Sequence, residues 1–352
     1  MLGIDRRAAR YAFTSALVLL LLYLVYLVRA TIFIFILALL FAYLLSPLVN
    51  ALDRVLPRSR TRAPALALAY IIFLGIVVLL GVQVGTRVVE QAHELGTRLP
   101  AMIESLKGAT DKTQSAPTSL QAQIVEKIEA EVAKRSGDLI SWLAAAGVKF
   151  VTVAGDLIYV VIVPILGFFF LKDGAEIRQH LLDLVQGDSH RELLDEIMAD
   201  VNVLLAHYMR ALVVLAVAAF TAYSIFFTVT GIPYGVLLAA LAGMLEFIPM
   251  IGPLTASVMI VVVTAVSGGP VLATLIFLAV YRMIQDYVLS PHLMGQGIQM
   301  HPLLVLFGVF AGAEIAGISG TFLSVPVLAL VRILFRRIRK ARLGIQKAPI
   351  PV

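Results

Sequence analysis

GIPYGVLLAALAGMLEFIPMIGPLTASVMIVVVTAVSGGP, residues 231–270, is the stretch that decides the fold. It is strongly apolar, yet Gly and Pro divide it into apolar segments at 236–248 and 254–267, and the first is too short to cross a bilayer comfortably as a helix. Backbone that is not helical at membrane depth persists only where protein or a water-filled cavity satisfies its polar groups. The interruptions therefore predict broken or re-entrant helices around a hydrated path, which is typical of transport sites.

The composition of the whole chain points to a membrane. Of 352 residues, 60% are hydrophobic and 14% are charged, and the mean hydropathy is +0.96. An ordinary soluble domain has about 45–50% apolar and about 25% charged residues. Because one globule cannot hide this much apolar surface, a soluble enzyme is excluded. We expect an all-α, polytopic integral membrane protein with the lipid bilayer as its main partner.

Apolar runs and charge patterns divide the chain into six parts. We expect transmembrane helices 1–3 in residues 1–85, an extracytoplasmic amphipathic insert in 86–147, helix 4 in 148–171, a cytoplasmic amphipathic loop in 172–206, a transport core of interrupted helices in 207–335 and a basic tail in 336–352. About eight spans are expected in total, with one or two of the broken elements re-entrant.

Two amphipathic helices are predicted outside the bilayer. In the insert, apolar residues recur every fourth position at Leu120, Ile124, Ile128 and Val132, and in the loop they recur at Leu193, Ile197, Val201 and Leu205. The insert helix is expected to be a solvated arm, with a gate or an oligomer contact as the alternative. The loop helix is expected to lie along the membrane surface.

The charge distribution predicts the orientation of the chain. The formal net charge is +6, and the basic residues gather beside apolar runs, near the amino terminus, at 54–62 and at 332–342. Positive charge in short loops stays in the cytoplasm, so both termini are expected inside a bacterial inner membrane. A nucleic-acid partner is not expected. The absence of Cys excludes disulfides and thiolate chemistry.

Four charged residues lie in or beside apolar runs of the carboxy-terminal half. Each of Glu246, Arg282, Asp286 and Glu314 would cost at least ~2.5–3.5 kcal/mol if unpaired in the membrane. Arg282 and Asp286 are four residues apart and can neutralise each other on one helix face, which favours a structural role. Glu246 and Glu314 lie at helix breaks and are candidates for binding a proton during transport. The alternative is that each is simply hydrated or caps a helix.

Glycine and proline at the breaks complete the set of transport-path candidates, namely Pro249, Gly252, Pro253, Gly312, Gly317 and Gly320. Residues 238–247 also resemble residues 306–315, because both are short apolar segments that end in Ala-Gly, a carboxylate and a breaker. Repeated interrupted segments are typical of transporters built from repeats. Chance similarity between helices rich in small residues is the alternative.

No motif for catalysis or cofactor binding is found. The six His show no zinc-ligand spacing, and neither a phosphate-binding loop nor a Gly-x-Ser-x-Gly motif is present. We therefore expect no enzymatic activity, no cofactor and no metal site.

Four stretches resemble the autoinducer-2 exporter family of bacterial permeases. They are YLLSPLV at 43–49, PILGFFFLKDG at 164–174, the segment at 231–253 and the segment at 289–326. Their order and spacing match over nearly the whole chain. The resemblance implies an inner-membrane transporter with an extracytoplasmic insert after helix 3, assembled as a homo-oligomer. The chain departs from the family pattern after Tyr208, where Met209 and Arg210 follow instead of Gly-Gln.

Three functions are consistent with the sequence. The first is a secondary transporter that exports a small polar solute, because some members of the resembled family are associated with export of autoinducer-2. The second is a sodium or lithium/proton antiporter, with which other members are associated. The third is a membrane scaffold whose insert binds partners.

Overall fold

The computed structural model describes residues 6–56, 62–110, 127, 157–294 and 300–343, and all regular structure in these ranges is helical. The elements are α1 (Arg6–Leu27), α2 (Arg29–Val55), α3 (Ala63–Leu80), η1 (Gly81–Gly85), α4 (Thr86–Thr110), α7 (Leu157–Asp183), α8 (Asp188–Thr230), α9 (Gly235–Leu245), α10 (Ile251–Val266), α11 (Val271–Ile284), η2 (Gln285–Leu289), α12 (Ser290–Met294) and α13 (Pro302–Arg342). Within the described ranges, six helices are long and apolar enough to span a membrane, and α9 and α10 are shorter apolar helices. The prediction of an all-α polytopic membrane protein is confirmed.

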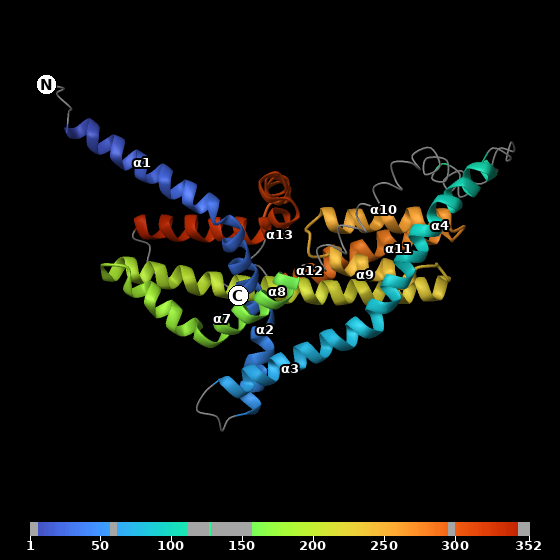
Figure 1. Ribbon diagram of the computed structural model, residues 1–352, viewed down its shortest axis with the longest axis horizontal. Coiled ribbons are helices and arrows are strands. Elements are labelled where there is room, and N and C mark those ends of the chain that lie inside the picture. The colour runs from blue at the N-terminus through green and yellow to red at the C-terminus, as the bar shows by residue number, and fades with distance from the viewer. Residues whose placement is uncertain (1–5, 57–61, 111–126, 128–156, 295–299, 344–352) are drawn as a thin grey trace.

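The long helix α8 is the axis of the fold. Its 43 residues contain neither Gly nor Pro, and the helix begins after Gly187 and ends at the left-handed Gly231. At 1.5 Å per residue it is about 65 Å long. Figure 1 shows α9, α10 and α11 beside one half of α8 and α13 beside the other half. The amphipathic segment expected at 193–205 is the first part of this helix and continues without a break into the following apolar run.

The interrupted stretch at 231–270 folds as a helical hairpin, here called the first hairpin. Its arms are α9 and α10, and residues 246–250 form its tip. Gly252 allows the close approach at this tip, because a Cβ atom there would overlap the backbone carbonyl of Leu245. The amino-terminal end of α9 is tied to α4, since the Leu237 amide donates to Gln91 Oε1 across 2.9 Å.

The carboxy-terminal element α13 is also a hairpin, here called the second hairpin. Its backbone leaves helical geometry at Ala316 and Gly317, which separates a first arm from a longer second arm. The arms meet at Gly312 and Gly320, where a Cβ atom on either glycine would overlap the backbone of the other. The two similar sequence segments, 238–247 and 306–315, thus each contain the last part of the first arm of a hairpin.

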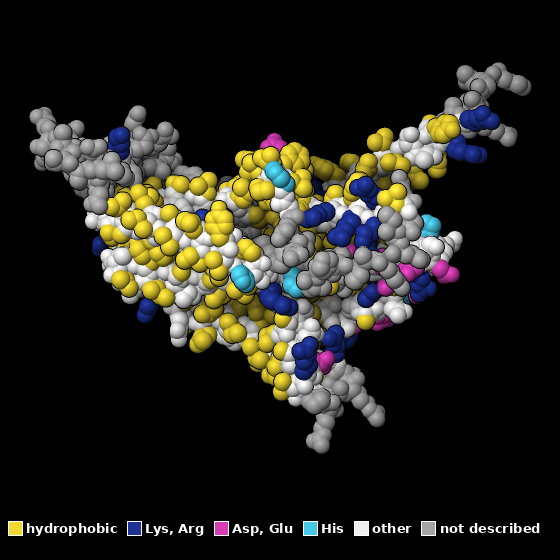
Figure 2. All heavy atoms as spheres, turned by 180° about the vertical axis from the view of Figure 1, so that it is seen from behind, with side chains coloured by type: hydrophobic (Ala, Val, Ile, Leu, Met, Phe, Trp, Pro, Cys, Tyr) yellow, Lys and Arg dark blue, Asp and Glu magenta, His cyan; other side chains and the backbone are white. Residues whose placement is uncertain are grey.

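The helices α1, α3 and α7 contact α2. Gly167 of α7 lies against Ala38 and Phe41 of α2, and the Tyr70 hydroxyl of α3 donates to the Pro164 carbonyl across 2.8 Å. The apolar run of α1 is exposed throughout, and Figure 2 shows hydrophobic side chains over a broad face of the molecule. Such a surface is typical of a protein that faces lipid.

Two predicted elements are only partly covered by the described residues. The fourth membrane helix was expected at 148–171; the described part of α7 begins at Leu157 and continues to Asp183. The amphipathic helix expected at 120–132 lies outside the described residues, apart from Lys127.

Candidate functional site

The candidate site is built on a buried carboxylate at the tip of the first hairpin. Glu246 directly follows α9 and is 7% exposed. Gln285 lies at the start of η2, is 3% exposed, and donates from Nε2 to Glu246 Oε2 across 2.5 Å. A hydrogen bond in a low-dielectric interior is stronger than in water, so this contact ties the hairpin tip to the helix opposite.

The π-helical turn η2 places Gln285 at this position. It interrupts the α-helical hydrogen bonding between α11 and α12 over Gln285–Leu289. Single π-helical turns occur often at functional sites, because the wider turn changes the direction of the side chains that follow. Here the side chain at the start of the turn is the hydrogen-bond partner of Glu246.

Two tyrosines form the apolar wall of the site. Tyr223 of α8 and Tyr281 of α11 are buried, and their ring centroids are 5.0 Å apart. Both rings belong to the apolar cluster against which Leu245, the residue before Glu246, also packs. The Tyr281 hydroxyl is buried and has no hydrogen-bond partner among the described residues. Burying a hydroxyl group without a hydrogen-bond partner costs free energy, and a bound ligand that accepts its hydrogen bond would remove this cost.

An ion pair lies beside the buried carboxylate. Arg282 Nε and Asp286 Oδ2 are 2.8 Å apart, and both side chains are about half exposed. This is the pairing expected from their spacing, and Asp286 directly follows Gln285, the partner of Glu246. The site therefore contains two carboxylates and one guanidinium.

The tip that carries Glu246 has an unusual backbone. Met250 has φ of 62° and ψ of −53°, and the Ile251 amide donates to the Pro249 carbonyl across 2.7 Å. This is a γ-turn with a positive φ, a conformation that is rare and strained for a residue with a side chain. Strained backbone of this kind clusters at functional sites.

A third buried tyrosine lies on α8, where the two hairpins approach each other. Tyr208 is 1% exposed, and its hydroxyl has no hydrogen-bond partner among the described residues. The apolar cluster around it includes Phe247 from the tip of the first hairpin and Phe322 from the second hairpin. Phe247 directly follows Glu246, so the tip that carries Glu246 contacts the second hairpin in this cluster.

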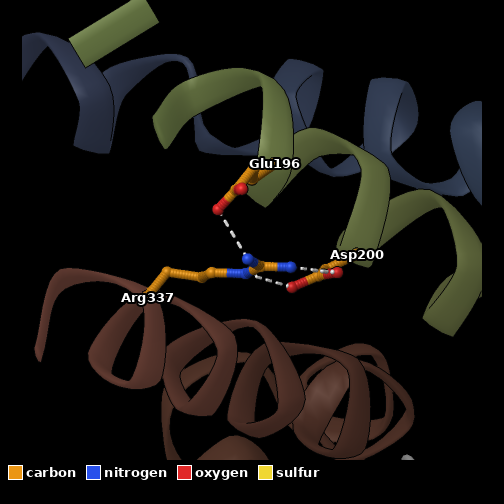
Figure 3. A network of polar contacts seen from close by, with 3 residues as sticks. All are labelled: Glu196, Asp200 and Arg337. Atoms are coloured by element: carbon orange, nitrogen blue, oxygen red, sulfur yellow. Dashed lines mark hydrogen bonds and ion pairs between the residues drawn. The ribbon is translucent and has the colours of Figure 1, made fainter. Parts of the chain in front are cut away.

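An ionic network joins the second hairpin to the amino-terminal part of α8. Arg337 donates to both carboxylate oxygens of Asp200, from Nε across 2.6 Å and from the second terminal nitrogen across 2.8 Å, and also lies 2.5 Å from Glu196 Oε2 (Figure 3). The Arg337 and Asp200 side chains are largely buried. The network holds the end of α13 at a defined position on α8.

The structure separates the predicted path residues into two groups. Glu246, Pro249, Gly252, Pro253, Arg282 and Asp286 lie in or beside the tip of the first hairpin, whereas Gly312, Glu314, Gly317 and Gly320 lie at the bend of the second hairpin. Glu314 is exposed, whereas Glu246 is buried. The two glutamates thus occupy different environments.

Four polar residues of the region were not among the sequence candidates, namely Tyr208, Tyr223, Tyr281 and Gln285. The sequence gives one reason to suspect Gln285, since it is an uncharged polar residue beside Arg282 and Asp286 in an apolar run. It gives none for the tyrosines, because a tyrosine in an apolar helix is common at any interface.

Comparison with known proteins places the chain in a family. The model of the AI-2E family transporter matches residues 15–340. The chain belongs to the AI-2E transporter family. The sequence resemblance to autoinducer-2 exporters is thereby confirmed at the level of the family, and the family is one of transporters.

Named relatives are similar over most of their length. The chain is 25% identical to "Putative transport protein YueF" of Bacillus subtilis over 303 residues, covering 84% of this chain and 81% of the relative. It is 26% identical to YrrI of the same organism, named in the same way, over 88% of this chain and 87% of the relative. It is 25% identical to the permease PerM of Escherichia coli K12, likewise named as putative, over 77% and 78%.

Proposed function

We propose that this member of the AI-2E family is a secondary transporter that exports a small polar solute, with autoinducer-2 as a candidate substrate and Glu246 as the central polar contact. The observation that carries the proposal is the Glu246–Gln285 hydrogen bond, a buried charge-assisted contact between the tip of a helical hairpin and a π-helical turn. Membrane proteins place such groups where a substrate or an ion passes, because their burial is otherwise costly.

The charge balance of the site supports coupling to a cation or a proton. Glu246 and Asp286 carry two negative charges when ionised, and Arg282 carries one positive charge. One negative charge is then uncompensated in a low-dielectric environment, which is unfavourable. A bound proton or monovalent cation removes this excess, so loading and release of that ion are linked to the position of the hairpin tip.

The hairpin architecture supplies an element that changes position. Glu246 lies on a short tip held by tight glycine packing and one strained turn, and the bond to Gln285 joins it to a different helix. A solute that replaces Gln285 on the carboxylate releases this link. The buried Tyr281 hydroxyl, which has no hydrogen-bond partner among the described residues, is in this proposal a second donor to the solute.

Transport by reconstituted protein tests the proposal. Glu246→Gln preserves the shape of the side chain and removes its charge, whereas Glu314→Gln makes the same change at an exposed glutamate. We expect Glu246→Gln to reduce solute efflux from vesicles and the extracellular accumulation of autoinducer-2 at least tenfold, while Glu314→Gln transports at the wild-type rate. Equal autoinducer-2 levels with and without the gene would remove that substrate.

Sodium or lithium/proton antiport is the second candidate, and the excess negative charge of the site favours it. Antiport predicts a salt-dependent proton flux in vesicles without any organic solute, and the flux is abolished in Glu246→Gln. A flux that persists in this variant would exclude the mechanism.

The proposal includes the setting of the transporter. We propose a bacterial inner membrane with both termini in the cytoplasm, on the basis of the basic residues beside the first and last spans. We also propose a homo-oligomer, and the fully exposed apolar run of α1 is consistent with contact to a second copy. Accessibility of single cysteines introduced near each terminus, and the mass of the protein in detergent, test these two points.

A further inference from the structure

We propose that the outer face of the second arm of α13 is a binding surface for anionic phospholipid headgroups. The surface, here called the basic stripe, is formed by Arg332, Arg336 and Arg339. A binding site for lipid does not depend on the transport proposal.

The basic stripe is accompanied by an apolar stripe on the same side of the helix. Val331, Phe335 and Ile338 are spaced by four and three residues and are exposed, Phe335 to 69%. The three arginines of the basic stripe have the same spacing one position later and are also exposed. Adjacent apolar and basic stripes on one helix are typical of a helix in the headgroup region, with the apolar side chains toward the acyl chains.

The ionic network on α8 holds this face outward. Arg337 points to the opposite side of the helix, where Glu196 and Asp200 bind its guanidinium (Figure 3). The contacts of Arg337 turn its side of α13 toward α8. Residues two positions apart on an α-helix point to nearly opposite sides, so the side chains of Phe335 and Arg339 are directed away from α8. The outward orientation of the two stripes is therefore a consequence of the fold.

The sequence after Glu314 provides no acidic residue that could pair with Arg336 or Arg339 along the same helix. No Asp or Glu follows Glu314, although seven Lys and Arg do. Within the described part of the chain, Arg336 and Arg339 have no ion-pair or hydrogen-bond partner on another side chain, unlike Arg337. A lipid phosphate is the complementary partner at the end of a membrane helix, since arginine binds phosphate through two parallel hydrogen bonds.

Lipid retention by the full-length protein tests the inference. The protein is reconstituted in nanodiscs of phosphatidylcholine with a minor fraction of phosphatidylglycerol, and the phosphatidylglycerol that stays bound after transfer to detergent is measured by mass spectrometry. We expect Arg336→Gln combined with Arg339→Gln to reduce the enrichment of phosphatidylglycerol about tenfold. The matched control is Arg87→Gln with Arg98→Gln on α4, which removes the same charge from another exposed place.

Three outcomes would overturn the inference. Equal loss in the control pair would show that net charge alone attracts the lipid. Unchanged enrichment in the Arg336/Arg339 variant would show that the stripe does not bind it. Displacement of the lipid by soluble glycerol 3-phosphate would identify a site for a free phosphate instead. Phe335→Ser with Ile338→Ser separately tests the apolar stripe, and we expect it to reduce retention of phosphatidylglycerol and phosphatidylcholine alike.

Discussion

Gln285 donates a hydrogen bond to Glu246 across 2.5 Å, although the two residues are 39 positions apart in sequence and belong to different elements of the fold. The contact joins the tip of the first hairpin to the π-helical turn after α11. It holds the buried carboxylate at one place in the fold. Substitutions of Gln285 and Glu246 separate the effect of this contact on stability from its effect on transport.

Gln285→Leu is expected to lower the free energy of unfolding by about 1–3 kcal/mol, because it leaves the buried Glu246 carboxylate without its donor. Combining it with Glu246→Leu removes both polar partners and is expected to recover most of this loss, although the double variant lacks the carboxylate that we propose is needed for transport. Thermal unfolding in detergent, followed by circular dichroism, measures the stability. A double variant as unstable as Gln285→Leu would contradict the pairing.

Gly252→Ala is expected to destabilise the protein by about 1–3 kcal/mol, because its Cβ atom meets the rigid backbone carbonyl of Leu245. The control is Gly75→Ala in α3, where nothing lies within 4 Å of the added atom. There the better helix propensity of alanine is expected to add about 0.5–1 kcal/mol. The same unfolding assay compares the two, and an equal effect at both positions would refute the close packing of the hairpin.

Met250→Gly is expected to raise the free energy of unfolding by about 1 kcal/mol, because glycine adopts a positive φ without strain. The Met250 side chain is 42% exposed, so little packing is lost. Met244→Gly, at a similarly exposed methionine inside α9, is expected to cost about 0.5–1 kcal/mol instead. Opposite signs in the two unfolding midpoints would support the strained turn; a loss at Met250 would argue against it.

Arg337→Met is expected to cost about 2–4 kcal/mol, because it leaves two carboxylates facing each other without their shared cation. Adding Asp200→Asn and Glu196→Gln removes the unpaired charges and is expected to restore much of the stability. Arg191→Gln breaks an exposed pair with Asp183 and is expected to change stability by less than about 1 kcal/mol. Urea titrations of the purified variants measure the loss of unfolding free energy in each. A loss for Arg337→Met as small as that for Arg191→Gln would contradict the proposed importance of the network.

Hydropathy and residue spacing, which are read from short stretches of sequence, predicted much of the fold. The apolar runs predicted membrane helices, the Gly and Pro residues of 231–270 predicted an interrupted segment, and four-residue spacing predicted the Arg282–Asp286 pair. These features are local, since a helix satisfies its backbone hydrogen bonds within its own segment. The absence of Gly and Pro from 188–230 allows α8 to continue through the segment expected as a separate loop, whereas the place where α7 and α13 contact its amino-terminal part is a tertiary result.

The sequence by itself determined that this chain lies in a membrane as helices and that its carboxy-terminal half is broken by Gly and Pro, because apolar content and backbone-breaking residues act over a few turns. Only the tertiary structure decided that Glu246 pairs with Gln285 and that Glu314 is exposed, although both glutamates follow similar segments. The burial of a side chain depends on which helices pack against it. That packing is set by contacts between residues far apart in the chain, which no local pattern records.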